Sequence, residues 1–258
     1  MVIHNNMMLS VVIPAFNEEG SLKKGVLNDV YDYLKNSNYK WQVLIVDDGS
    51  TDSTAKICED FVSKHSGFKL MKEPHRGKGG TVISGMLEAR GDYLLFADMD
   101  QATPLPEVEK LIDKLDNGFD IAIGSRHGRE GAPIIRKIMA YGFSLLRLLV
   151  LRLPFKDTQC GFKIFKKDAA NRIFGKMKIF TQTQSNSAGF NEKNPSVSAG
   201  FDLEVLYLAR KLGYKVAEVP VTWHHQEGTK VNPIRDSIEG FRDLMMVRLN
   251  SLQGKYKV

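Results

Sequence analysis

Cysteine is scarce in this chain of 258 residues, which contains only Cys58 and Cys160. A disulfide-stabilised protein needs more cysteines, and a structural zinc site needs cysteines or histidines at close, regular spacing. The sequence has neither pattern. We therefore expect a chain without disulfides, in a reducing, cytoplasmic setting.

Long apolar runs are also missing. Residues 1–8 include a histidine and two asparagines, so they lack the apolar core of a secretory signal. A membrane span needs about 20 mostly apolar residues. The most apolar segment, residues 134–153, is interrupted by four basic residues: Arg136, Lys137, Arg147 and Arg152. We expect this segment not to cross a bilayer, and any membrane contact to be peripheral.

The positive charge of the chain is concentrated in one segment. Residues 126–178 contain 13 lysines and arginines against 3 acidic residues, whereas the rest of the chain contains 23 basic and 27 acidic residues. A local basic region indicates an anionic partner, such as phosphate, nucleic acid or an acidic membrane surface. A solvated basic surface is the alternative reading. With 43% hydrophobic residues, the chain has enough apolar material for a sizeable core.

Strand-like and helix-like segments alternate through the first half of the chain. Short apolar runs predict strands, and apolar residues spaced by three and four positions predict helices. The predicted strands are residues 9–13, 43–46, 93–97 and 120–124. The predicted helices are residues 22–34, 53–65, 79–89 and 106–115. This alternation predicts an α/β fold with a mostly parallel central sheet and helices on both faces.

The second half has a different character. Residues 134–153 and 234–258 read as amphipathic basic helices, which either pack on the core or lie at a membrane interface. Residues 175–200 are polar with little periodicity, so we expect a mobile loop there. The predicted organisation is one domain over residues 1–230 and an amphipathic helical tail over residues 231–258.

Polar loops follow the predicted strands, at the edge where open α/β sheets bind ligands. These loops are residues 14–20, 47–53, 98–103 and 124–131. Asp98 and Asp100 come directly after a strand, so both carboxylates emerge on the same side of the chain. Hard oxygen ligands of this kind hold Mg²⁺ or Mn²⁺ while substrate phosphates complete the coordination shell. The loops therefore predict a cation site beside an arginine-containing anion site.

Several motifs in fixed order resemble those of the family 2 glycosyltransferases of GT-A fold, in particular the polyprenyl-phosphate glycosyltransferases. The motifs are PAFNEE (14–19), VDDGSTDST (46–54), RGKGGTVISGM (76–86), FADMDQAT (96–103), GSR (124–126), DTQCGFKIF (157–165), FDLE (201–204), VPVTW (219–223) and EGTK (227–230). The resemblance extends over about residues 8–250. It implies a GT-A fold: a mostly parallel central sheet flanked by helices.

The resemblance also implies roles for particular residues. The nucleotide-sugar donor would be bound by Pro14, Ala15, Asn17, Glu18, Asp48, Lys78, Asp98 and Lys230. Asp98 and Asp100 would ligate Mg²⁺ or Mn²⁺. Arg126, Arg136 and Lys137 would hold the phosphate of a polyprenyl or dolichyl acceptor. Asp157 and Gln159 would line the sugar.

The function implied is inverting transfer of a hexose, glucose from UDP-glucose by preference, onto a polyprenyl phosphate. The second pKa of a phosphate monoester is about 6, so its attacking oxygen is already anionic and needs no general base. A sugar hydroxyl acceptor would need a base, for which Asp157 and Asp202 are candidates. GDP-mannose or another UDP-sugar remains an alternative donor, although Ala140 stands where mannosyl relatives tend to have a hydroxyl residue.

Two readings without catalysis compete with this function. The segment IVDD after a strand resembles the acidic pocket of receiver domains, but that reading leaves Asp98 and Asp100 unexplained. A basic segment can also indicate nucleic-acid binding or an anionic-lipid binding module. Nucleic-acid binding predicts aromatic side chains between the basic residues. Here leucine and isoleucine dominate instead, so we expect no nucleic-acid partner; the sequence leaves the oligomeric state open.

Overall fold

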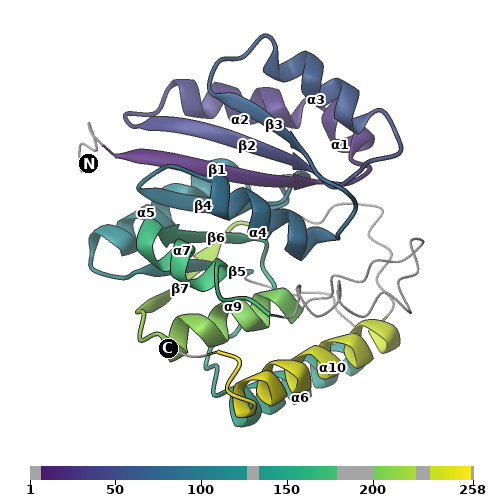
Figure 1. The fold of residues 1–258 in the computed structure, drawn as a ribbon, viewed down its shortest axis with the longest axis vertical. Coiled ribbons are helices and arrows are strands. Elements are labelled where there is room, and N and C mark those ends of the chain that lie inside the picture. Colours follow the sequence, from purple (N-terminus) through teal and green to yellow (C-terminus); the bar gives the residue numbers. More distant parts are fainter. Residues whose placement is uncertain (1–6, 127–133, 179–199, 225–232, 257–258) are drawn as a thin grey trace.

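The computed structural model describes residues 7–126, 134–178, 200–224 and 233–256, and these form one central sheet with helices on both faces (Figure 1). The strand order is β3-β2-β1-β4-β6-β5-β7. The strands are β1 (Met8–Ala15), β2 (Lys40–Asp47), β3 (Phe68–Lys72), β4 (Tyr93–Ala97), β5 (Ile121–Arg126), β6 (Phe162–Lys166) and β7 (Val216–Val221). Only β6 runs antiparallel to its neighbours. The predicted mostly parallel sheet is confirmed.

The central strands are buried on both faces, which explains their continuous apolar sequences. In β1, Val11 and Ile13 face one apolar cluster, while Val12 between them faces the other. The first cluster includes α1 (Glu19–Lys23), α2 (Val26–Lys35), α3 (Thr54–Val62) and α5 (Val108–Asp116). The second includes α4 (Lys78–Glu88), α7 (Lys167–Phe174) and α9 (Gly200–Lys211).

Two predicted helices differ in detail from those observed. The predicted helix over residues 22–34 is two helices, α1 and α2, because Gly25 between them adopts a φ of +87°, which a helix cannot continue through. The predicted helix over 106–115 begins as a 3₁₀ turn, η1 (Leu105–Glu107), before α5. The other predicted helices of the first half, α3 and α4, are present with boundaries shifted by a few residues.

The two predicted amphipathic helices are α6 (Ile134–Leu151) and α10 (Pro233–Leu252). They lie side by side beyond α9, on the side away from the sheet (Figure 1). Arg147 of α6 is buried and donates to Thr158 Oγ1 at 3.2 Å, so this arginine anchors the helix. Among the described helices, none combines the length and the apolar character that a membrane span requires. Most of the predicted mobile loop, residues 179–199, lies outside the described residues.

Candidate active site

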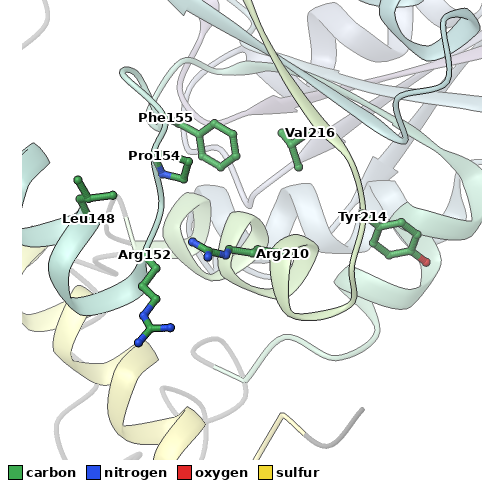
Figure 2. A pocket seen from close by; sticks show the side chains of 7 residues that line it. All are labelled: Leu148, Arg152, Pro154, Phe155, Arg210, Tyr214 and Val216. Carbon is green, nitrogen blue, oxygen red and sulfur yellow. The ribbon is translucent and has the colours of Figure 1, made fainter.

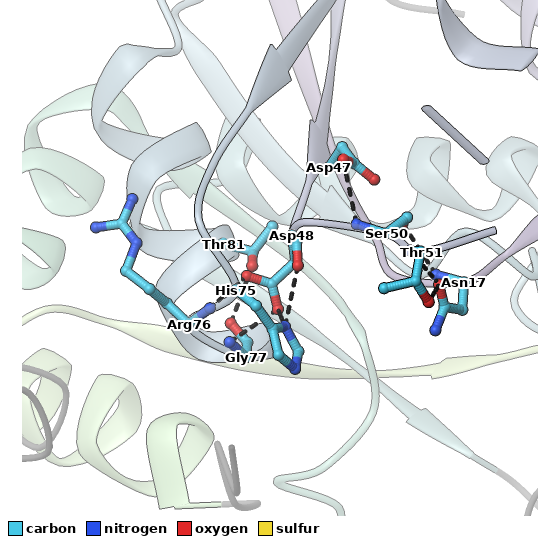
Figure 3. A network of polar contacts seen from close by, with 9 residues as sticks. All are labelled: Asn17, Asp47, Asp48, Ser50, Thr51, His75, Arg76, Gly77 and Thr81. Atoms are coloured by element: carbon cyan, nitrogen blue, oxygen red, sulfur yellow. Dashed lines mark hydrogen bonds and ion pairs between the residues drawn. The ribbon is translucent and has the colours of Figure 1, made fainter. Parts of the chain in front are cut away.

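The carboxyl ends of β1, β2 and β4 lie at one edge of the sheet, because these three strands are parallel neighbours. The loops after β1 and β2 are tied together there. Asn17, at a φ of +54°, accepts from the backbone N–H of Thr51 at 2.9 Å and donates its own N–H to Ser50 Oγ at 3.0 Å (Figure 3). The N–H of Glu18 donates to Thr54 Oγ1 at 2.8 Å. The predicted donor loop is therefore held in a defined shape.

Pro14 and Ala15 are the last two residues of β1, and Asp48 directly follows β2. Asp48 is buried and accepts three hydrogen bonds: from the N–H groups of Arg76 (2.7 Å) and Gly77 (2.8 Å) and from His75 Nδ1 (2.8 Å) (Figure 3). These bonds hold the turn that leads into α4. Direct contact between Asp48 and a donor therefore stays a prediction, whereas its structural role is observed.

His75 has a second partner. Its ring stacks on the ring of Phe16 with centroids 4.0 Å apart and an angle of 10° between the planes. Phe16 is 40% exposed, so the stacked pair forms part of the surface at the sheet edge. The side chain of Asp48 thus fixes His75, and His75 supports the exposed aromatic ring of the first loop. This link could not be predicted from local sequence, since Phe16 and His75 belong to loops far apart in the chain.

Lys78 opens α4 and forms an ion pair with Asp98, with Nζ and Oδ1 2.5 Å apart. Burial alone would lower the pKa of Lys78, but the surrounding carboxylates, Asp98 foremost, outweigh burial and raise it. The first backbone N–H groups of a helix and a lysine at the same place attract anions. A diphosphate bound beside the Asp98–Lys78 pair would therefore face both the N-terminus of α4 and the Asp98 carboxylate.

Hydrogen bonds within the loop after β4 define its shape. The carbonyl oxygen of Asp98 accepts from the backbone N–H of Gln101 at 3.2 Å and from Gln101 Nε2 at 3.0 Å. Asp100 Oδ1 accepts from the N–H of Ala102 at 3.0 Å, and Met99 is buried between the two acids. Gln101 has a φ of +48°, an uncommon conformation for a residue other than glycine. These bonds hold the loop and the Asp100 carboxylate, while the Asp98 carboxylate is held by its ion pair with Lys78.

Electrostatics around this loop favour a cation. Burial raises the pKa of Asp100, and the negative charge of Asp98 adds to the shift. Burial likewise raises the pKa of Glu18, although a hydrogen bond from Ser21 opposes it; the charges of Asp100 and Asp98 add to the rise. Each carboxylate thus destabilises the charge of its neighbours, and a positive ion among them would relieve this repulsion.

The carboxylates of Asp98 and Asp100 suit a divalent metal ion whose other ligands come from a substrate. Within the described residues, no three His, Cys, Asp or Glu side chains converge as a metal-binding group. Mg²⁺ and Mn²⁺ sites are often completed by substrate phosphates and water, with only one or two protein carboxylates. Asp98 and Asp100 are therefore chemically suited to a site that a nucleotide diphosphate would complete, and their role as metal ligands stays a prediction.

Arg126 and Asp157 form a second charged group. The guanidinium is bidentate: Nε donates to Oδ2 at 2.6 Å and Nη2 to Oδ1 at 2.9 Å. Burial would raise the pKa of Asp157, but its hydrogen bonds with Arg126 outweigh burial and lower it to about 2. Glu218 accepts from the N–H groups of Lys156 (2.9 Å) and Asp157 (2.7 Å), which fixes this turn. Such an aspartate is a poor general base.

A series of contacts connects the Asp98–Asp100 loop with the Arg126–Asp157 pair. The guanidinium carbon of Arg126 lies 5.8 Å from the centre of the Trp223 ring. The next residue, His224, donates its N–H to the carbonyl oxygen of Ala102 at 2.7 Å. Ala102 in turn donates to Asp100. The loop after β4, which carries Asp98 and Asp100, therefore lies at the same edge of the sheet as Arg126. A cation-bound donor and a second anion would meet there.

A buried ion pair, Lys163 with Asp202, holds the turn before β6 that lies against Asp98. Lys163 of β6 is fully buried and donates to Asp202 Oδ1 at 2.6 Å and to the carbonyl oxygen of Cys160 at 2.5 Å. Burial raises the pKa of Asp202, and the positive charge of Lys163 opposes the rise. Because Asp202 is buried and paired, it too is unsuited to act as a base. Gly161, next to Cys160, lies against the carboxylate of Asp98.

The remaining predicted site residues are only partly described. Gln159 is exposed, and its N–H donates to Asp157 Oδ1 at 3.1 Å. Arg136 and Lys137 lie in the first turn of α6, but their side chains are outside the described residues, as is all of Lys230. Sequence reasoning assigned no role to Gly161, Lys163, Trp223 or Glu218, although the first three fall within the quoted motifs. His75 and Gln101 were also missed.

Comparison with known proteins agrees with this geometry. The chain belongs to glycosyl transferase family 2, whose model matches residues 10–174. It is 35% identical to the dolichyl-phosphate beta-glucosyltransferase of Dictyostelium discoideum, over 98% of this chain and 78% of that protein. It is also 35% identical to the Saccharomyces cerevisiae protein of the same name, over 97% of this chain and 77% of that protein.

A solved structure shows the same fold. The glucosyl-3-phosphoglycerate synthase of Mycobacterium tuberculosis, in complex with Mn²⁺, uridine diphosphate and glucosyl-3-phosphoglycerate, superposes with a TM-score of 0.62. The two proteins are 18% identical, and the match covers 98% of this chain and 81% of the other. The expectation of a glycosyltransferase with a GT-A-type fold is confirmed.

Proposed function

We propose that this protein is an inverting glycosyltransferase that moves glucose from UDP-glucose to a polyprenyl or dolichyl phosphate, at the cytoplasmic face of a membrane. The observation that carries the proposal is the placement of the Asp98–Lys78 pair and the Arg126–Asp157 pair at one edge of the sheet. The names of the two eukaryotic relatives supply the sugar and the lipid.

The donor would bind at the first group. Asp98 and Asp100 would hold Mg²⁺ or Mn²⁺ against the diphosphate, and Lys78 with the start of α4 would face the same phosphates. When bound, a divalent ion stabilises the negative charge of the departing nucleoside diphosphate. Asn17 and Glu18, fixed by the loop after β2, would lie at the uridine, and Lys230 would reach the phosphates.

The state of the carboxylates supports a phosphate acceptor over a sugar hydroxyl. Asp157 and Asp202, the two candidate bases, are each held in an ion pair. A phosphate monoester, with a second pKa of about 6, needs no base at neutral pH. Its attack on the sugar carbon from the face opposite the leaving group would invert the configuration there. Arg126, Arg136 and Lys137 would offset the repulsion between two anionic substrates.

Binding and turnover across a panel of donors test the proposal. The donors are UDP-glucose, UDP-galactose, UDP-N-acetylglucosamine and GDP-mannose, each with Mg²⁺ or Mn²⁺, and the acceptors are a polyprenyl phosphate in detergent and a free sugar. We expect rapid transfer only from UDP-glucose to the polyprenyl phosphate, giving a β-linked product. Preferred use of GDP-mannose, or transfer to the free sugar alone, would overturn the proposal.

A further inference from the structure

Arg126 has hydrogen-bond donors that its ion pair with Asp157 does not use. A guanidinium carries five N–H groups, and Asp157 accepts from Nε and Nη2. Among the described residues, Nη1 of Arg126 has no hydrogen-bond partner. The side chain is partly accessible, with 23% of its area exposed. Arg126 can therefore donate to a second anion while it keeps its bonds to Asp157.

The ring of Trp223 lies against the same guanidinium. Cζ of Arg126 is over the ring, 5.8 Å from its centre. A cation within about 6 Å of an aromatic ring centre is attracted to the face of the ring, and most strongly to that of tryptophan. The indole carries no net charge. It therefore restrains the arginine without cancelling its positive charge, which a second carboxylate would do.

Backbone hydrogen bonds on both sides of Trp223 hold it in place. The N–H of Thr222 donates to Glu107 Oε2 at 3.1 Å, and the N–H of His224 donates to the carbonyl oxygen of Ala102 at 2.7 Å. Trp223 itself is 38% exposed. A tryptophan that only filled the core would be buried, so packing alone does not account for this position.

We propose that Trp223 is a positioning residue, which holds the Arg126 guanidinium so that Nη1 faces the phosphate of the acceptor. The identity of this anion rests on the proposed function. Asp157 alone leaves the guanidinium free to move with the aspartate side chain, whereas a ring on a separate element restricts that movement. An arginine already held in one orientation loses less conformational entropy when it binds an anion. Removal of the ring should therefore weaken binding of the phosphate.

Binding of geranyl phosphate, a short prenyl phosphate, tests the inference without turnover. Calorimetry gives its dissociation constant in the presence of UDP and Mn²⁺. We expect Trp223→Leu to weaken binding by about tenfold, because the aromatic face is lost. Trp223→Phe keeps an aromatic face and should stay within about threefold of wild type. The affinity for UDP, measured separately, should be unchanged in both variants.

A double-mutant cycle separates positioning from general packing. Arg126→Gln alone should weaken binding of geranyl phosphate by more than about tenfold. Adding Trp223→Leu to Arg126→Gln should cost less than about twofold more, because the ring then has no guanidinium to hold. A merely structural role of Trp223 would instead give losses that multiply, and this result would overturn the inference.

A second contact between an arginine and an aromatic ring provides a matched control. Cζ of Arg172 is over the ring of Tyr214, also 5.8 Å from its centre. Tyr214 precedes β7 and Trp223 follows it, so the two contacts lie at opposite ends of that strand. Tyr214 lines a pocket of about 520 Å³ with Arg152 and Arg210, and no residue that lines this pocket belongs to the candidate active site (Figure 2). Tyr214→Leu should bind geranyl phosphate and UDP like wild type.

Three further results would overturn the inference. They are wild-type affinity in Trp223→Leu, equal losses in Trp223→Leu and Trp223→Phe, and the same loss in Tyr214→Leu. Absence of geranyl phosphate binding by wild type would overturn it as well. Thermal unfolding followed by circular dichroism checks that each variant is folded, and Trp223→Met takes the place of Trp223→Leu if the latter does not fold.

The transfer assay distinguishes this inference from the proposed function. If Trp223→Leu weakens binding of geranyl phosphate but wild type transfers no glucose, the proposed function is wrong and the positioning role stands. If wild type transfers glucose to a polyprenyl phosphate and Trp223→Leu binds geranyl phosphate like wild type, the positioning role is wrong and the function stands.

Discussion

Gly161 lies directly against the carboxylate of Asp98. A Cβ atom at residue 161 would overlap the carboxylate, with Asp98 Oδ1 only 2.6 Å away. Lys163 fixes the same turn by donating to the carbonyl oxygen of Cys160. The backbone before β6 therefore lies against Asp98, a predicted metal ligand, and leaves no room for a side chain at residue 161.

Substitution of Gly161 by alanine should impair catalysis more than stability. The new methyl group would push the Asp98 carboxylate away from Lys78, and misplacement by about 1 Å can cost about 100-fold in rate. We expect kcat/KM to fall by about that factor while the protein remains folded by circular dichroism. Gly142→Ala is the matched control, since a Cβ atom there meets nothing within 4 Å. Wild-type turnover by Gly161→Ala would show that Asp98 can move without consequence.

Loss of Lys163 should destabilise the fold. Its removal in Lys163→Met leaves Asp202 buried without its charged partner, and breaking a buried pair typically costs about 3–5 kcal/mol. Urea unfolding should show a loss of that order. The double variant Lys163→Met with Asp202→Leu should recover much of it, because no unpaired charge remains. A double variant less stable than the single one would contradict this explanation.

Replacing Asp157 by asparagine should lower both stability and activity. The bidentate contact with Arg126 would be lost, and we expect the free energy of unfolding to fall by about 2 kcal/mol at neutral pH. The exposed pair of Lys35 and Asp32 gives a control, since Asp32→Asn should change stability by less than about 0.5 kcal/mol. Equal effects of the two substitutions in urea unfolding would remove the special role of Asp157.

The ion pair of Asp157 with Arg126 should also make the stability of the protein depend on pH. The pKa of Asp157 is lowered to about 2 in the folded protein, against about 3.9 in an unfolded chain. A lowered folded-state pKa adds stability that is fully present above about pH 4 and is lost as the pH falls toward about 2. The stability difference between wild type and Asp157→Asn should therefore shrink on acidification across that range. A difference that stays constant or grows would exclude this assignment.

Much of the first half of the fold was predictable because its strands are buried on both faces. β4 (YLLFA) and the centre of β1 (Val11 to Ile13) are continuous apolar runs, a signal that can be read from a single sequence. β6 and β7 gave no such signal. β6 contains Lys163, whose burial depends on Asp202 in another element, and β7 contains Pro220 and Glu218, which read as loop residues. Such tertiary pairing cannot be read from local periodicity.

The site was predictable in part for similar reasons. Asp98 and Asp100 follow a strand, so local sequence places them at the sheet edge. Arg126 and Asp157 entered through family resemblance, and their mutual ion pair joins residues on separate elements. The contact between Gly161 and Asp98 could not be predicted, because nothing in the sequence shows that the glycine makes room for a carboxylate.

Transfer of labelled glucose from UDP-glucose to a polyprenyl phosphate, measured with and without Mg²⁺ or Mn²⁺ for wild type and Asp100→Asn, would show whether a cation bound by Asp100 is needed for the reaction. Cation-dependent binding of UDP, followed by calorimetry, gives the matching binding measurement. We predict product only with the metal ion, and a loss of at least about 100-fold in transfer, with loss of the cation-dependent UDP affinity, for Asp100→Asn. Full transfer after chelation, or by the variant, would exclude a cation held by Asp100 from the reaction.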